Sequence, residues 1–257
     1  MDRRAFIEAS TVALGAPMTL AAANAPEQSS LFELRMHTLP AKKLPILDAF
    51  LSGALVPALK RLGVGPVGVF HEAPEKDELR SFVLIVHKDP ESAVTLRTRL
   101  AADEGFRTTA ADYRNAPAAD PVYHRIERSL LVAIAGMPTL ERPDASKPRL
   151  FNLRVYESHN ERAAMKKIEM FEKAELAIFR RVGLTPVFFA SSVFGPAQPN
   201  LTYMLVFKDE ADRKAAWDRF RVDAEWQKLR AIPEYADKEI VSRITNRILT
   251  PAPYSEI

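Results

Sequence analysis

The chain has 257 residues, 47% of them hydrophobic and 27% charged, which is ordinary for a globular protein and long enough for two domains. Its 36 basic residues are interleaved with 33 acidic ones, so no basic stripe indicates a nucleic-acid partner. The absence of cysteine excludes disulfides, thiolate nucleophiles and cysteine-ligated metals.

The first 30 residues have the pattern of an export signal. Arg3 and Arg4 lie in a charged start, residues 11–23 form a short apolar run, and residues 21–25 supply small-residue cleavage sites. The arginine pair resembles a twin-arginine translocation signal. The apolar run is too short to span a bilayer, so we expect no membrane span after cleavage. We therefore expect a periplasmic or secreted bacterial protein; the alternative is a disordered amphipathic tail.

One long segment of the chain occurs twice. LFELRMHT at 31–38 returns as LFNLRVYE at 150–157, and both show the side-chain alternation of strands. Later landmarks return in the same order, such as RLGVGPV at 61–67 and RVGLTPV at 181–187. The duplication predicts two copies of one domain.

Each copy is predicted to have the ferredoxin-like order β-α-β-β-α-β. In the first copy we expect strands at 31–38, 67–72, 79–88 and 122–132, helices at 41–62 and 90–102, and a short helix at 106–114. In the second we expect strands at 150–157, 186–194, 201–208 and 238–249, and helices at 160–182 and from 210 through 220. Pro57 is expected to kink the first helix. The tail from Thr250 is expected to lie along the surface.

The strands carry apolar residues at both odd and even positions, for instance at 83–86, so both faces of each sheet must be covered. Helices cover one face of a ferredoxin-like sheet, and a second sheet is the economical cover for the other. We predict an α+β protein whose domains, 31–135 and 149–257, pack sheet to sheet within one chain, after a leader (1–30) and joined by a linker (136–148). Further homo-oligomerisation is left open.

Three polar residues share one face of the first strand: Glu33, Arg35 and His37. A charge in a strand that is buried on both faces must be paired or line a polar cavity. The functional interpretation makes Glu33 a base, Arg35 an anion-orienting group and His37 an acid/base. The alternative is a structural salt-bridge network between the sheets.

Histidines cluster near strand ends in the first copy. His37, His71 and His124 are predicted to lie at the same end of the sheet, where a His37–His124 pair would form a general base or a partial metal site. Without HxH or HxxxH spacing we predict no metal site. The alternative is a set of separate, half-exposed histidines.

The second copy is rich in aromatic residues. Candidate ligand-binding residues, taken together with His124, are Arg154, Tyr156, Phe188, Tyr203 and Trp226. They would line an apolar pocket, and the alternative is core packing. The chain shows no phosphate-binding glycine loop, so we expect no cofactor.

Several motifs resemble the NIPSNAP family of the dimeric α/β-barrel superfamily. They are FELRMH at 32–37, FNLRVY at 151–156, DAEW at 223–226 and NRILTP at 246–251. The resemblance implies an intramolecular dimeric α/β-barrel. It implies no agreed chemistry, because the superfamily includes cofactor-free monooxygenases, haem-degrading enzymes and isomerases, which place ligands between sheet and helices.

Three functions follow from these observations. The first is an exported NIPSNAP-like protein that binds a small, largely apolar molecule between sheet and helices. The second is a cofactor-independent monooxygenase or isomerase that uses Glu33, Arg35 and His37. The third is a scaffold for a protein partner.

Overall fold

The computed structural model describes residues 29–257. The predicted export signal lies almost wholly outside these residues. None of the helices within 29–257 is long and apolar enough to cross a membrane.

The first half of the molecule has the predicted β-α-β-β-α-β order. Its elements are β1 (Leu31–Pro40), η1 (Ala41–Lys43), α1 (Leu44–Phe50), the π-helical turn η2 (Leu51–Leu55), α2 (Val56–Arg61), β2 (Val67–His71), β3 (Glu78–His87), α3 (Pro90–Ala102), α4 (Glu104–Thr109), α5 (Ala111–Arg114) and β4 (Arg125–Ala133).

The second half repeats that order. Its elements are β5 (Leu150–Glu157), α6 (Glu161–Met170), the π-helical turn η3 (Phe171–Glu175), α7 (Leu176–Val182), β6 (Thr185–Phe194), β7 (Asn200–Phe207), α8 (Glu210–Val222), α9 (Ala224–Arg230), η4 (Pro233–Tyr235), α10 (Asp237–Ile240) and β8 (Arg243–Pro251).

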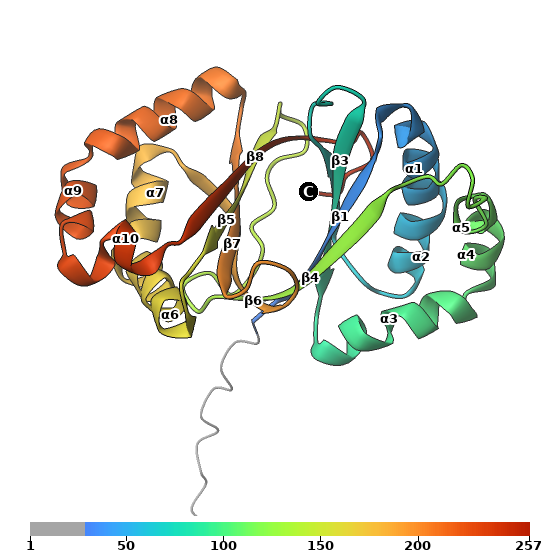
Figure 1. The fold of residues 1–257 in the computed structure, drawn as a ribbon, viewed down its shortest axis with the longest axis horizontal. Helices are drawn as coiled ribbons and strands as arrows, with labels where there is room; N and C mark the ends of the chain where they lie inside the picture. The colour runs from blue at the N-terminus through green and yellow to red at the C-terminus, as the bar shows by residue number, and fades with distance from the viewer. Residues whose placement is uncertain (1–28) are drawn as a thin grey trace, which may run out of the picture.

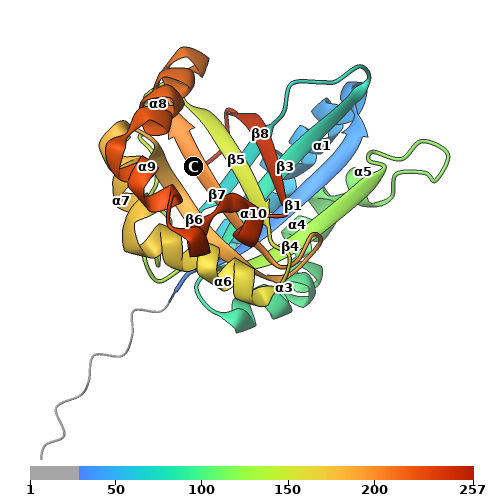
Figure 2. The same cartoon turned by 60° about the vertical axis from the view of Figure 1, so that its left-hand side comes forward.

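The two sheets form one closed barrel with the helices outside, which confirms the predicted fold. The strand order around the barrel is β1-β3-β2-β8-β5-β7-β6-β4. Figure 1 shows the helices of the two halves on opposite sides of the strands, and Figure 2 shows strands of both halves side by side. The halves meet at two seams, where β2 pairs with β8 and β4 pairs with β6.

The barrel interior is filled by apolar side chains from both halves. Phe32 of β1 and Phe188 of β6 lie with ring centroids 5.0 Å apart, and Phe70 and Phe151 lie 4.7 Å apart. Because side chains alternate along a strand, the neighbours of these residues face outward, toward the helices. Each half therefore has a second core between its sheet and its helices.

One repeated landmark has a direct structural role. Arg61 pairs with Asp103 at 2.6 Å, and Arg181 pairs with Asp223 at 2.9 Å. Each aspartate also caps the helix that follows it, because its carboxylate accepts the backbone N–H three residues on. The same pair thus ties the end of the first helix to the start of a later helix in both halves.

The tail after β8 does not lie along the surface as predicted. Ile257 is fully buried in the barrel interior, and Figure 1 shows this end of the chain between the two sheets. The tail follows β2, where Ser255 Oγ accepts the Val69 N–H and the Glu256 N–H donates to the Val67 carbonyl. Apolar burial outweighs the two prolines on which the surface prediction relied.

Two other local predictions differ from the structure. The closing strand begins at Arg243, since residues 237–240 form α10. The helix around Pro57 continues through the π-helical turn η2 with α-helical backbone angles at both of its ends. A π-helical turn at the matching place in the second half, where Ala177 replaces the proline, shows that Pro57 does not cause it.

The connection between the halves is packed rather than free. The backbone N–H groups of Ile134 and Glu141 donate to carbonyls of Phe189 and Val187 on β6. Met137 is buried against the second half. The segment therefore extends the seam at which β4 meets β6.

Candidate functional site

Strand alternation divides the residues of β1 between two environments. Phe32 and Leu34 point into the barrel, and Glu33, Arg35 and His37 face the helices of the first half. This arrangement confirms that the three polar residues share one face of the strand, and it puts two of them in a cleft.

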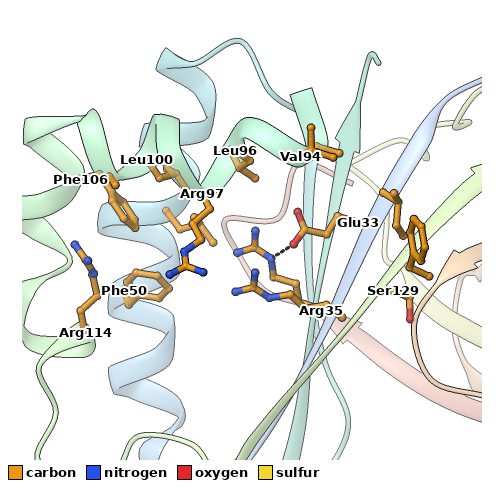
Figure 3. Close-up of a pocket in the computed structure, with 16 residues that line it drawn as sticks. Glu33, Arg35, Phe50, Val94, Leu96, Arg97, Leu100, Phe106, Arg114 and Ser129 are labelled. Atoms are coloured by element: carbon orange, nitrogen blue, oxygen red, sulfur yellow. Dashed lines mark hydrogen bonds and ion pairs between the residues drawn. The ribbon is translucent and has the colours of Figure 1, made fainter. Parts of the chain in front are cut away.

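The cleft lies between β1 and β4 on one side and the first-half helices on the other. Its volume is about 680 Å³. The lining residues are Glu33, Arg35, Phe50, Leu55, Ala93, Val94, Leu96, Arg97, Leu100, Ala101, Phe106, Arg114, Arg128, Ser129, Leu130 and Phe194. Figure 3 shows the side chains of Arg35 and Arg97 extending toward the same part of the cleft from the strand and from α3.

Positive charge dominates this cleft, because four arginines line it against one carboxylate. Arg35 pairs with Glu33 at 2.6 Å. Within residues 29–257, Arg97, Arg114 and Arg128 form no ion pair.

Arg128 lies directly opposite Arg35 in the β1–β4 ladder. Burial and the neighbouring Arg35 charge lower the pKa of Arg128. Three uncompensated guanidinium groups beside apolar walls favour an anionic ligand.

Glu33 is held as a carboxylate. Burial raises its pKa, but hydrogen bonds from His87 and Arg35 and the Arg35 charge outweigh that effect and set the pKa to about 2. Its other oxygen lies 3.4 Å from His87 Nε2, and His87 Nδ1 lies 3.1 Å from Ser92 Oγ. Because the carboxylate only accepts, Nε2 of His87 carries the proton. With such a low pKa, Glu33 is a weak base that instead orients Arg35.

His37 is buried and electrically neutral at pH 7. Burial, together with the charges of Arg35 and Arg128, lowers its pKa from 6.5 to about 4. Within the described residues, its Nδ1 has no hydrogen-bond partner. The ring packs edge-on against Tyr123, with centroids 6.1 Å apart. His37 is therefore a neutral imidazole near two guanidinium groups, and a backbone hydrogen bond at Ser81 only partly opposes the fall of its pKa.

The three histidines at this end of the sheet are engaged separately. His37 lies opposite Ile126 in the ladder, and His71 lies 3.2 Å from Asp48. His124 is exposed and lines a surface hollow with Lys42 and Glu75. The predicted His37–His124 pair is therefore not among the interactions of residues 29–257.

The second half brings together four of the predicted ligand-binding residues. Tyr203 donates a hydrogen bond to Tyr156 at 2.8 Å, and Arg154 donates to the same Tyr156 oxygen at 3.2 Å. Trp226 belongs to the same core cluster. Burial raises the pKa of Tyr203 well above its usual value. Phe188 points to the opposite side of the sheet, into the barrel.

Aromatic side chains fill the space between sheet and helices in this half. The rings of Phe189 and Tyr203 stack with centroids 4.5 Å apart, and Phe171 lies 5.0 Å from Phe189. Phe189 and Tyr203 are fully buried. Core packing, one of the two interpretations of these residues, accounts for their geometry.

A buried ion pair in the second half was not foreseen. Lys167 and Glu175 lie 2.9 Å apart, and each side chain is 2% exposed. The Lys167 ammonium lies 4.6 Å from the centre of the Phe171 ring. Burial raises the pKa of Glu175, and the charge of Lys167 opposes that rise. Nothing in the sequence distinguishes these two residues from the exposed charges of α6.

Four further residues that line the cleft were not predicted from the sequence: Arg97, Arg114, Arg128 and Phe194. Arg128 could have been predicted, because the pairing of β1 with β4 puts it beside Arg35. Phe194 could not have been predicted, because it reaches the first-half cleft from the second half, across the β4–β6 seam.

Comparison with known proteins matches the second half to a family and the whole chain to a fold. The NIPSNAP family model matches residues 151–256. Proteins described as "putative monooxygenase" from Fusobacterium nucleatum and Lactobacillus acidophilus share 7% and 12% identity, with TM-scores of 0.58 and 0.57. Each similarity covers 87% of this chain, and 93% and 94% of the other chain respectively.

An anthrone oxidase-like protein shares 10% identity over 88% of this chain and 93% of its own, with a TM-score of 0.55. A NIPSNAP-like domain protein from Burkholderia xenovorans, 21% identical, covers 42% of this chain and 90% of its own, with a TM-score of 0.38. No protein of curated function matches the sequence. The chain therefore has the α/β-barrel fold of these structures, and its residues 151–256 match the NIPSNAP family model.

Proposed function

We propose that the protein binds a small organic anion between sheet and helices of its first half. The observation that carries this proposal is the convergence of Arg97, Arg114 and Arg128, none of them in an ion pair within residues 29–257, on a cleft of about 680 Å³. That volume lies in the range of small-molecule sites, roughly 300–1,000 Å³. The apolar walls suit the body of such a ligand, and the guanidinium groups suit a carboxylate or phenolate.

The charge arrangement supports an anion over the purely apolar ligand expected from the sequence. Glu33 neutralises Arg35, which leaves the other arginines of the cleft uncompensated. Bringing like charges together costs free energy that a bound anion recovers. The size of the cleft, about 680 Å³, also favours a small molecule over a protein partner, which would need a larger surface.

The test is binding of benzoate and octanoate, measured by calorimetry at low ionic strength. Arg128→Gln should weaken binding of both by roughly tenfold or more, because it removes a charged hydrogen-bond donor. Arg107→Gln is the matched control, since Arg107 is exposed on α4 and does not line the cleft. Equal affinities for wild type and Arg128→Gln would refute the anion site.

A second candidate is a cofactor-independent monooxygenase or isomerase that acts on this anion. Its support is His37, which is neutral, buried and unpartnered at Nδ1 near Arg35 and Arg128. His37 does not itself line the cleft, so the substrate would have to reach past Arg35 for the neutral imidazole to take its proton, and the arginines would stabilise the added negative charge. The two solved structures named as monooxygenases share the fold, which by itself assigns no reaction.

The test of this candidate is oxygen consumption or isomerisation with an anion that binds. Activity should be constant above pH 5 and fall as pH drops through about 4, where His37 gains its proton. His37→Gln should remove turnover and leave binding within about threefold of wild type, since the arginines remain. Turnover that persists in His37→Gln would remove His37 from the mechanism.

We also propose that residues 1–30 direct export, and that residues 31–135 and 149–257 are two copies of one domain joined by 136–148. The support is the arginine pair, the short apolar run and the ordered repeat of landmarks. Periplasmic delivery should fail in Arg3→Lys/Arg4→Lys. Unchanged delivery would refute the twin-arginine interpretation.

A further inference from the structure

Two large apolar side chains are exposed at the rim of the cleft. Val94 of α3 is 73% exposed and Phe194 of β6 is 69% exposed, yet both line the cleft. We call Val94, Leu130 and Phe194 the apolar lip. Single exposed apolar residues are common, but three that border one charged cleft offer apolar surface to a ligand that enters it.

Close packing at the seam fixes the backbone position of Phe194. It pairs with Leu130 at the point where the β4–β6 ladder shifts register. The next residue, Gly195, has φ +143°, and a Cβ there would lie 2.6 Å from Ser129 Oγ. Only glycine allows this approach. The hairpin that follows is braced by Asn200, whose side-chain amide donates to the Ala197 carbonyl at 2.9 Å.

The strand register gives the order of groups along the cleft. Glu33 lies opposite Leu130, and Arg35 lies opposite Arg128. The lip and the arginine pair are therefore two residues apart along β4, or about 7 Å. Figure 3 shows Val94 on the Glu33 side of the cleft, and Arg97 and Arg114 farther from Glu33. The Glu33 carboxylate beside the lip is paired with Arg35 and accepts a hydrogen bond from His87.

The geometry points to an amphipathic organic anion as the ligand, with its charged group on Arg97 and Arg128 and its hydrocarbon chain across the apolar lip. This inference rests on the proposed anion site and names its ligand class. It also makes Phe194 a specificity-determining residue that the second half supplies to the cleft of the first. A ligand chain that covers the lip removes apolar surface of both halves from water.

The test is a series of acetate, octanoate and dodecanoate, titrated by calorimetry below the concentration at which micelles form. Affinity for the wild-type protein should rise along the series, by up to about fourfold for each methylene that the lip buries. Phe194→Ser should weaken dodecanoate binding about tenfold and leave acetate binding unchanged. Val222→Ser is the matched control, because Val222 of α8 is 80% exposed and lies outside the cleft.

Arg128→Gln separates the two proposals. If this variant weakens all three ligands and Phe194→Ser leaves dodecanoate binding unchanged, the anion site stands and the lip inference is overturned. If Phe194→Ser weakens acetate as strongly as dodecanoate, Phe194 acts through structure and the inference is also overturned. Unchanged binding of all three ligands in Arg128→Gln would overturn the anion site itself.

Discussion

The two halves share a backbone plan and differ in what occupies the space between sheet and helices. In the first half, Arg35 and Arg128 face an open cleft. In the second, Arg154 is covered by Trp217, whose ring lies 4.6 Å from the guanidinium, and Tyr156 and Tyr203 are buried behind it. The same order of elements thus supports a lined cleft in one half and a filled core in the other. The difference lies in side-chain volume rather than in topology.

The same contrast holds on the helices. Where α1 and η2 of the first half present Leu47 and Leu55, the matching positions in α6 and η3 are Lys167 and Glu175, paired and buried. The aromatic groups around this pair exclude water. The Lys167 ammonium lies over the face of the Phe171 ring. The second half therefore contains its own buried charge, whereas the first half leaves its guanidinium groups open to a ligand.

The largest expected effect concerns the buried pair. Lys167→Met should destabilise the protein by about 3–5 kcal/mol, because Glu175 is left as an uncompensated buried carboxylate. Lys167→Leu/Glu175→Leu, which copies the first half, should recover most of that loss. Urea unfolding measures both. A double variant that is as unstable as the single one would show that the pair is needed for packing rather than for charge balance.

The next largest effect is a pH dependence of stability caused by His37, whose counterpart in the second half is Tyr156. Folding lowers the pKa of His37 from 6.5 to about 4. The stability that neutral His37 contributes to the folded protein is therefore fully present above pH 6.5 and is lost as the pH falls toward 4. The contribution lost between pH 7 and pH 5 is about 2 kcal/mol. Stability measured by urea unfolding should show this slope, and His37→Leu should flatten it. His159→Leu, at an exposed histidine, should keep the slope; a flattened slope there would assign the effect elsewhere.

A third experiment converts the first half toward the second. Arg97 occupies the place on α3 that Trp217 holds on α8. Arg97→Trp should weaken octanoate binding about tenfold or more, because it removes one charged donor and fills part of the cleft. Arg107→Trp on α4 is the control. Calorimetry that shows equal losses in the two variants would mean that general charge, not the cleft, attracts the anion.

The smallest effect tests the polar contacts within the second core. Tyr203→Phe removes the 2.8 Å hydrogen bond to Tyr156 and should cost about 1 kcal/mol, since Tyr156 keeps its bond from Arg154. Urea unfolding at pH 7 measures the loss. A cost several times larger would mean that the Arg154–Tyr156–Tyr203 chain acts as one cooperative network.

The sequence predicted the features that depend on local pattern. The alternation in β1 and β5 and the repeated landmarks give the order of elements, and apolar residues of both parities predict the barrel. Asp89 and Asp209 cap their helices, as their positions before α3 and α8 suggest. The polar face of β1 was also predicted, and its charges were expected either to be paired or to line a polar cavity; Arg35 does both.

What could not be predicted depends on contacts between distant segments. Phe194 reaches the cleft only because β6 pairs with β4 at the seam. Ile257 is buried because the tail follows β2 and packs into the barrel interior, which no local pattern reveals. The roles of Glu33 and His37 depended on their neighbours, since His87 and Arg35 hold one charged and burial keeps the other neutral.

The closed ring of strands has a consequence for how the chain folds. β8 lies between β5 and β2, and the tail beyond it bonds to Val67, 189 positions before Glu256. The first half is synthesised long before these partners, so the outer edges of β2 and β4 stay unpaired in the meantime. Pairing across so long a span is slow, and an open edge is a template for another strand. We therefore expect an isolated first half to close its ring with a second copy of itself.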